Sequence, residues 1–426
     1  MPYIVPSDKN QVWVQLAALY DNLAQGQPTA TPVAFNSLLA ADAIRTKDCK
    51  INQRVENVLR DDTRSDFRTP IDTYPGNAEA EFEIEGCLSP SGTPGVAPDW
   101  GPGILDYIFG PPTVDPGVSV LYSPPLDLMS VDTALVLLQA YGPDRANYLV
   151  NGFIESATFS FVNGERSMVK VSGKGAMGGE IGFATANTQV SGTTITVPTT
   201  HYLEALRRWV GNKIYFLDGV TVLPIDNGGA GYTLVSVAAF GGTTAVVSPA
   251  VALPNGGNLI RAFVPARTLA SDVVVSGPAG VTIAVATNAA QNLRCKSCEI
   301  TIDRVTSIRR EAGFSGPSGA HFAEFAATVK LEMVADVFNA HLLDVARHLA
   351  DLSVGAELAI TFDAFQSIFT STGRRLRVTM PRVVLLDEPD FSPNAGDAYT
   401  LGISGRLLTT SIINTTHEDS LQLKFL

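Results

Sequence analysis

The sequence predicts a mainly β protein of the α+β class, with a few packed helices. Most of the chain consists of short apolar or alternating runs separated by clusters of Gly, Pro and Asn, which is typical of strands and turns. Helical spacing of apolar residues is confined to four short segments. A series of motifs also occurs twice along the chain, which predicts two related β-rich units.

The expected strands either alternate apolar and polar residues or are short apolar runs rich in β-branched side chains. They cover residues 78–85, 153–161, 167–172, 213–217, 232–237, 245–251, 273–276, 281–286, 299–305, 326–334, 357–362, 374–385 and 399–404.

The expected helices carry apolar residues three and four positions apart. They cover residues 11–25, 98–109, 200–210 and 339–352. The second begins with Pro98 and stops at Gly110, residue types that favour the first turn and the end of a helix. The last begins at Asn339, which can cap it, and has one apolar face.

Two halves of the chain share sequence matches in the same order. The matches are Arg54-Val-x-x-Val-x-Arg-Asp with Arg304-Val-x-x-Ile-x-Arg-Glu, Cys49-Lys-Ile with Cys298-Glu-Ile, and Val171-Ser-Gly-Lys with Ile403-Ser-Gly-Arg. An alternating strand, a helix and a two-stranded unit also follow one another in both halves. We therefore expect an N-terminal arm and helix (1–39), a first module (40–185), a β-rich insert (186–289) and a second module (290–426).

The composition indicates a folded protein with enough apolar residues to form interfaces between subunits as well as a core. Hydrophobic residues make up 45% and charged residues 17% of the 426 residues, and the mean hydropathy is +0.16. A disordered chain has the opposite balance, so most of this chain should be folded. The apolar composition also leaves room for large interfaces buried between subunits. No stretch reaches the roughly 18 apolar residues of a membrane span, and the start lacks a secretory signal. We expect a protein kept in the cytosol of the producing cell, with no membrane partner.

Residues that could carry chemistry lack the partners they need. Cys295 and Cys298 form a single CxxC that leads into a strand, and Cys49 and Cys87 are not spaced as the second pair of a zinc site. Residues 173–178 fit GxGxxG, but no helical pattern follows them. The five histidines show no metalloprotease spacing. We expect no enzyme activity, no cofactor and no metal.

Acidic residues concentrate on one expected strand. Glu79, Glu81, Glu83 and Glu85 alternate with apolar residues, so their carboxylates share one strand face. One interpretation is an ordinary solvated outer face. The other is a channel wall whose negative charge keeps passing DNA from adhering, and the net charge of −12 without a basic stripe agrees with it. The matching face of the second half reads Thr-x-Lys-x-Glu over residues 328–332, which weakens the second interpretation there.

Each half runs strand, long loop, strand, helix and hairpin. The segments of the two halves that carry a family resemblance are residues 86–94, Ala97-Pro-Asp-Trp, Ile108-Phe-Gly, Val120-Leu-Tyr, the segments 339–352 and 357–362, and the ending with Pro381, Pro389 and Gly396. In this order and texture the chain resembles the tail tube (major tail) proteins of long-tailed bacteriophages and their relatives in contractile injection systems. The arm and the insert lie outside the resemblance.

The resemblance implies a structural virion protein. In that family each module adds a sheet to an inner barrel, and modules join edge to edge into six-fold rings, so two modules in one chain imply a pseudo-hexameric ring of three subunits. Rings would stack through the polar loop 61–77 and the arm 1–10 into a tube through which DNA is ejected. Implied partners are further copies of the chain, terminator, tape measure and distal tail proteins, and DNA in the lumen. The implied location is the virion tail, after assembly in the host cytoplasm.

Two other functions stay open at this point. A distal-tail or hub ring would use the same module without polymerising. A soluble carbohydrate-binding or adhesin-like protein would need an exposed aromatic platform. The three tryptophans, Trp13, Trp100 and Trp209, all lie in expected helices, so the sequence shows no evidence of such a platform.

Overall fold

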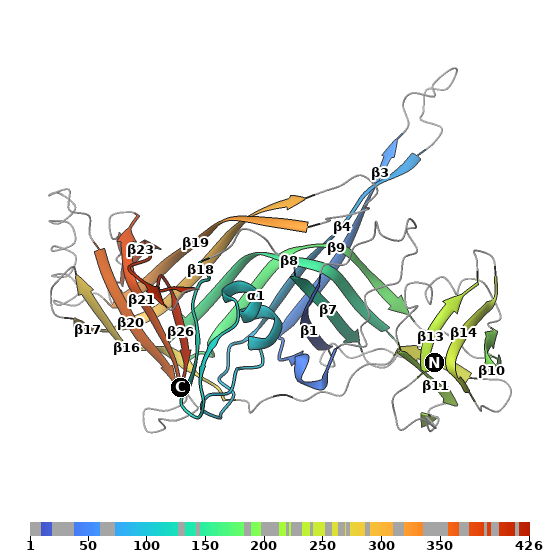
Figure 1. Cartoon of the computed structure of the whole chain (residues 1–426). Helices are drawn as coiled ribbons and strands as arrows, with labels where there is room; N and C mark the ends of the chain where they lie inside the picture. Colours follow the sequence, from blue (N-terminus) through green and yellow to red (C-terminus); the bar gives the residue numbers. More distant parts are fainter. Residues whose placement is uncertain are drawn as a thin grey trace, which may run out of the picture.

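The computed structural model is mainly β, with large antiparallel sheets, which confirms the predicted class (Figure 1). It describes residues 10–18, 38–59, 73–126, 133–141, 145–182, 189–196, 213–218, 221–222, 232–238, 242–251, 258–262, 269, 273–285, 290–309, 319–334, 357–365, 375–386, 390–392, 400–413 and 417–426. The expected helices 200–210 and 339–352 lie outside these residues.

A first set of strands comes from the N-terminal half. Its members are β1 (Asn10–Ala18), β2 (Ala43–Ile44), β3 (Asp48–Leu59), β4 (Thr73–Cys87), β7 (Thr133–Tyr141), β8 (Arg145–Val162) and β9 (Met168–Gly182). They pair in the order β3-β4-β9-β8-β7-β1-β2, always antiparallel.

A second set comes from the C-terminal half. Its members are β16 (Ser276–Val285), β17 (Gln291–Leu293), β18 (Cys295–Arg309), β19 (Gly319–Val334), β20 (Glu357–Phe365), β21 (Arg375–Leu385), β22 (Asp390–Ser392) and β23 (Thr400–Leu407). They pair in the order β18-β19-β23-β21-β20-β16-β17, and β22 lies on β23 beyond the end of β21. The order is the same as in the first set.

The registers of the two sets agree as well. The corresponding rows are Cys49/Ile84/Val171 across β3, β4 and β9, and Cys298/Leu331/Ile403 across β18, β19 and β23. The cysteine and Val/Ile-Ser-Gly matches in the sequence therefore occupy equal positions in the two sheets.

Strand β8 joins the sets, because its C-terminal half also pairs with β18. A second link runs through β26 (Gln422–Phe425), which pairs with β21 on one side and with β6 (Ser119–Tyr122) on the other. Strand β6 pairs in turn with β5 (Thr113–Asp115), and β24 (Ile412–Ile413) with β25 (His417–Glu418).

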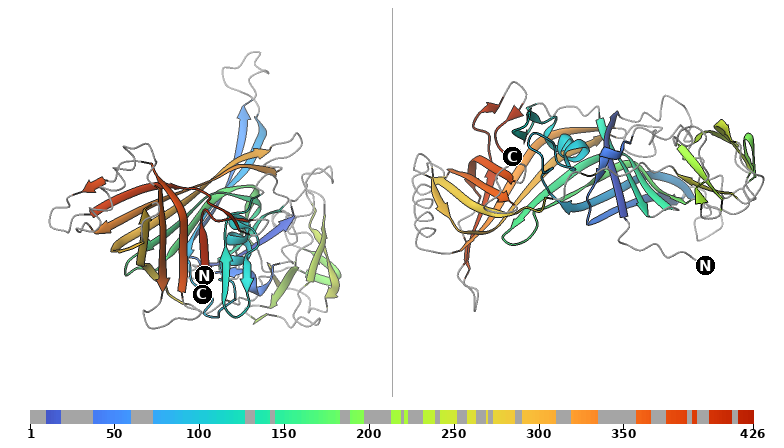
Figure 2. Two further views of the ribbon diagram at one scale, coloured as in Figure 1. Left: turned by 60° about the vertical axis from the view of Figure 1, so that its left-hand side comes forward. Right: turned by 90° about the horizontal axis from the view of Figure 1, so that it is seen from below.

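A small separate sheet comes from the middle of the chain. It contains β10 (Gln189–Thr196), β11 (Lys213–Asp218), β12 (Thr221–Val222), β13 (Tyr232–Val237), β14 (Thr244–Val251) and β15 (Asn258–Ala262). It lies at the end of the molecule opposite β16 and β17 (Figure 2).

The core runs continuously beneath both strand sets. Helix α1 (Asp106–Phe109) lies under the arch of the large sheet (Figure 1). Its Phe109 ring is centred 6.2 Å from Phe159 of β8 and 6.2 Å from Phe325 of β19, so one side chain contacts both sets. Tyr122 and Phe425 form an edge-on pair 6.0 Å apart across the β6–β26 link.

Three local expectations were wrong. Residues 11–25 were expected to be helical, but Asn10–Ala18 is strand β1 between β2 and β7. Val12, Trp13 and Val14 are all buried, so this strand is covered on both faces and lacks the alternation that identifies half-exposed strands. The segment 98–109 forms a π-helical turn (Gly101–Leu105) followed by the four residues of α1, because non-helical angles at residues 102 and 103 interrupt the helix. Residues 273–275 are not in a strand, and β16 begins at Ser276.

Two equivalent glycines permit the close approach of neighbouring strands. A Cβ added at Gly173 would fall on the carbonyl oxygen of Phe153, and one at Gly405 would fall on Cγ1 of Val383. We therefore expect Gly173→Ala and Gly405→Ala each to lower the free energy of unfolding by at least about 2 kcal/mol, measured by urea denaturation. Ser172→Ala is the control, with an expected change within about 0.5 kcal/mol. Equal effects at Gly173 and Ser172 would contradict the steric explanation.

Asp106, at the start of α1, gives stability a pH dependence. Burial, partly offset by the Tyr122 hydroxyl, raises the pKa of Asp106 to about 6, above its ordinary value. The folded protein thus holds this proton more tightly than the unfolded chain, and stability is lost as the pH rises from about 4 through 6. We expect Asp106→Asn to lose less thermal stability than the unmodified protein between pH 4.5 and pH 7.5. The exposed Asp115→Asn should follow the unmodified protein, and a parallel loss in the Asp106 variant would refute this assignment.

Candidate functional site: a charged sheet face and two open strand edges

The four glutamates of β4 lie on one face of the large sheet. Glu79, Glu81, Glu83 and Glu85 are half-buried, whereas the residues between them point into the core. Those intervening residues are Ala80, Phe82 and Ile84, at most 3% exposed.

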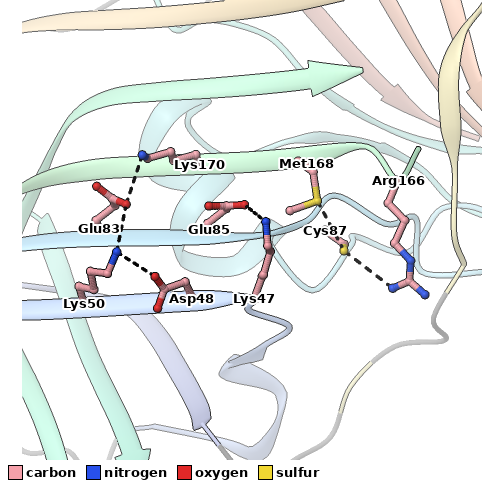
Figure 3. Close-up of polar contacts among 9 residues, drawn as sticks. All are labelled: Lys47, Asp48, Lys50, Glu83, Glu85, Cys87, Arg166, Met168 and Lys170. Atoms are coloured by element: carbon pink, nitrogen blue, oxygen red, sulfur yellow. Dashed lines mark hydrogen bonds and ion pairs between the residues drawn. The ribbon is translucent and has the colours of Figure 1, made fainter. Parts of the chain in front are cut away.

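Lysines on or next to the flanking strands form ion pairs with Glu83 and Glu85 (Figure 3). The Nζ of Lys47 lies 2.8 Å from Oε1 of Glu85, and the Nζ of Lys170 on β9 lies 3.2 Å from Oε1 of Glu83. The Nζ of Lys50 on β3 lies 4.0 Å from the same oxygen of Glu83. The hydrogen bond to Glu85 raises the pKa of Lys47.

Further ion pairs continue the pattern at both ends. The Nζ of Lys50 lies 3.0 Å from Oδ2 of Asp48, and the Nζ of Lys174 lies 3.6 Å from Oε1 of Glu79. Basic side chains on β9, on β3 and just before β3 therefore lie beside Glu79, Glu83 and Glu85. The sequence indicated the acidic strand but not the lysines beside it.

The second strand set carries a shorter version of this arrangement. The Nζ of Lys296 lies 3.2 Å from Oε1 of Glu332, and the hydroxyl of Ser297 donates to the same carboxylate over 3.3 Å. By register, Lys296 and Glu332 stand where Lys47 and Glu85 stand in the first set. The charged face thus extends over both sets.

An open hollow of about 260 Å³ lies on this face among β3, β4, β8 and β9. Its polar lining comes from Lys50, Asn52, Glu81, Glu83, Glu155, Ser172 and Lys174. Glu155 stands at a bulge of β8, between Ile154 and Ser156. Burial raises the pKa of Glu155, and nearby Lys174 opposes that shift.

The joint between the two sets is a regular antiparallel pairing. Residues 156–162 of β8 pair with residues 297–303 of β18. On its core side, Phe159 lies opposite Ile300, and both are fully buried. On the polar side, the Ser156 hydroxyl donates to Oδ1 of Asp303 over 3.1 Å. Backbone pairing and core packing therefore hold the joint together.

Two strand edges that correspond to this joint are open. Within the described part of the chain, β3 pairs with β4 alone, and β22 pairs with β23 alone. Strand β3 is the counterpart of β18, and β22 lies on β23 as the C-terminal half of β8 lies on β9. An unpaired edge is a template for strand addition.

Three of the four cysteines, Cys49, Cys295 and Cys298, are buried. Burial raises the pKa of the Cys49 and Cys295 thiols to about 12, and it raises that of Cys298 as well. The Cys295 thiol donates to the carbonyl oxygen of Ser297 over 3.2 Å. Among the described residues, no three His, Cys, Asp or Glu side chains could hold a metal ion, and no helix is long and apolar enough to cross a membrane.

The residues of the GxGxxG match lie inside β9, where the structure has a continuing strand rather than a helix start. Of the histidines, His417 lies in β25 and His321 in β19, whereas His201, His341 and His348 lie outside the described residues.

The ion pairs of the charged face should contribute little to stability, because they are exposed to water. For Lys170 and Glu83, a double-mutant cycle with Lys170→Ala and Glu83→Ala should give a coupling energy below about 1 kcal/mol. High salt should reduce this value further. The remote pair Lys170 and Asp115 is the control, with coupling near zero. A salt-independent coupling above about 2 kcal/mol would contradict this assignment of the face to solvent.

Comparisons with known proteins identify no relative, so a functional proposal rests on the geometry described above. No protein-family model matches the chain, and no curated protein matches it in sequence.

Proposed function

We propose that the protein is a structural subunit that assembles into stacked rings, as the tail tube of a bacteriophage-like particle. The observation that carries the proposal is the β8–β18 joint: two strand sets of equal order and register are joined edge to edge within one chain. A joint of this kind can be repeated between chains.

In this proposal the two strand sets are copies of one tail-tube module. The first copy begins at β1 rather than at residue 40, because β1 pairs with β7 inside the first set. The second begins at β16 rather than at residue 290, because β16 pairs with β20. The small sheet of β10–β15 is then the insert between the copies.

The open edges support ring formation. Among the described strands, β3 at one end of the strand order and β22 at the other are each paired on one edge only, so the contact between subunits would be head to tail. Closure into a ring removes both edges, which otherwise favour aggregation. With two modules per chain, three subunits complete a pseudo-hexameric ring.

The charged face supports a channel wall that does not hold DNA. It lies on the opposite side of the sheet from α1 and the core. Because lysines are interleaved with the glutamates, this face presents DNA with neither a continuous basic surface nor a wholly acidic one. DNA would pass along it without specific contacts.

The β3–β4 hairpin supports stacking, because its described end projects beyond the rest of the sheet (Figure 1). In the assembled tail, the partners would be further rings, terminator, tape measure and distal tail proteins. The location would be the virion, after assembly in the host cytoplasm, and no cofactor or catalysis is involved.

The carbohydrate-binding alternative lacks support from the aromatic residues. Trp13 and Trp100 are at most 1% exposed, and the indole of Trp100 donates to the carbonyl oxygen of Arg45 over 3.2 Å. Trp209 lies outside the described residues. Neither described tryptophan is available for an aromatic sugar platform.

Negative-stain electron microscopy of the purified protein over a concentration series tests the proposed function. Hollow tubes with a regular axial repeat and three subunits per ring are expected. Single rings that never stack would favour a hub or distal-tail protein, and monomers at every concentration would refute self-assembly.

A variant lacking residues 62–74 separates ring formation from stacking in the same assay. Removing the end of the β3–β4 hairpin should leave soluble subunits or rings that no longer polymerise. A Gly/Ser replacement of equal length controls for shortening of the connection. Normal tubes from the deletion would refute the stacking role of the hairpin.

A further inference from the structure

The β8–β18 joint shows which residues of the open β3 edge would face an added strand. Because the rows that contain Cys49 and Cys298 coincide, residues 48–53 of β3 stand where residues 297–302 of β18 stand. Those β18 residues accept β8 along their outer edge. The corresponding β3 edge carries exposed Lys50 and Asn52, with buried Ile51 between them.

The same comparison defines positions on β22. In the first set, Phe159 of β8 lies opposite Val169, two residues before Val171. In the second set, Phe391 of β22 lies opposite Leu401, two residues before Ile403. Since Val171 and Ile403 occupy the same row, Asp390-Phe-Ser stands where Thr158-Phe-Ser stands on β8.

We propose, on the basis of the ring assembly above, that β22 of one subunit adds to the β3 edge of a second copy in the register of the internal joint. In β8–β18, Thr158, Phe159 and Ser160 lie opposite Thr301, Ile300 and Glu299. Between subunits, this register places Asp390 opposite Asn52, Phe391 opposite Ile51 and Ser392 opposite Lys50, with antiparallel strands.

The charges at these positions favour pairing of β22 with β3 over pairing of β22 with β18. Asp390 would lie opposite the neutral Asn52 and diagonal to Lys50, a residue of opposite charge. The same β22 residue placed on β18 would lie opposite Thr301, between Glu299 and Asp303, and would be repelled by both. The β18 edge is in any case already occupied by β8 of its own chain.

The backbone chemistry at the end of the joint also agrees with this register. After Ser392 the sequence continues with proline, a residue type without an amide hydrogen to donate. The carbonyl oxygen of Cys49 already accepts a hydrogen bond of 2.7 Å from the buried Nε2 of Gln139. No donor from a second subunit is needed there, so the pairing can end at Ser392 without leaving that carbonyl unsatisfied.

Disulfide cross-linking between variants that each carry one introduced cysteine tests the register. Asn52→Cys and Asp390→Cys proteins, each with Cys87→Ser, are mixed under assembly conditions and oxidised. Directly opposite residues are within reach of a disulfide, so covalent dimers should form in the mixture but not in either protein alone. Trypsin should release the linked peptides, since Lys50 separates position 52 from Cys49.

Two matched controls define the result. Lys50→Cys with Asp390→Cys is displaced by two residues, about 7–8 Å, and should give roughly tenfold less dimer. Thr158→Cys with Thr301→Cys should form a link within one chain, because these residues are partners in the internal joint. Equal dimer from the displaced pair would overturn the register.

Electron microscopy of the same samples separates the two proposals. Rings without the Asn52–Asp390 cross-link would overturn the inference and leave the proposed function standing. The absence of both rings and cross-link would refute both.

Discussion

Strand β8 is long enough to form two strand pairings along one edge, and the architecture depends on this. Its N-terminal half takes β7 on that edge, and its C-terminal half takes β18, while β9 follows its other edge throughout. A bulge between Ile154 and Ser156 separates the two halves, and such bulges bend a strand and increase its twist. The first half of β8 can therefore pair within its own strand set while the second half joins the other set. Phe109 then packs beneath the joint and contacts both sets.

Sequence reasoning succeeded where periodicity was local and clear. Strand β13 has the predicted bounds, and the alternation of β4 correctly separates its glutamates from its core residues. It failed at β1, because Val12, Trp13 and Val14 are buried together, and a strand covered on both faces has no period of two. It also could not anticipate the non-helical angles at residues 102 and 103, which depend on how the turn before α1 packs.

The candidate functional surfaces were predictable only in part, for a physical reason. The glutamates are visible in one segment, but the lysines that pair with them lie on β9, on β3 and just before β3, and only the strand register shows which charges meet. The sequence matches at Cys49 and Cys298 do contain register information, since these residues fall in the same row of the two sheets. The open edges could not be found from either half alone. The β3 edge is recognised as open only by comparison with the corresponding edge of β18 in the other strand set, which is paired with β8.

The link through β26 has a consequence for how the chain folds. Residues 422–425 lie between β6 and β21, so the hairpin of β5 and β6 finds its strand partner about three hundred residues further along the chain. Such distant contacts make folding slow, because a long loop must close before the contact gives any stability. During synthesis, the N-terminal half would leave the β6 edge without its β26 partner, and the Tyr122 ring without its contact to Phe425, until β26 has emerged. Folding of the two halves is therefore coupled, and a partly made chain lacks the completed surfaces on which the proposed association with other copies depends.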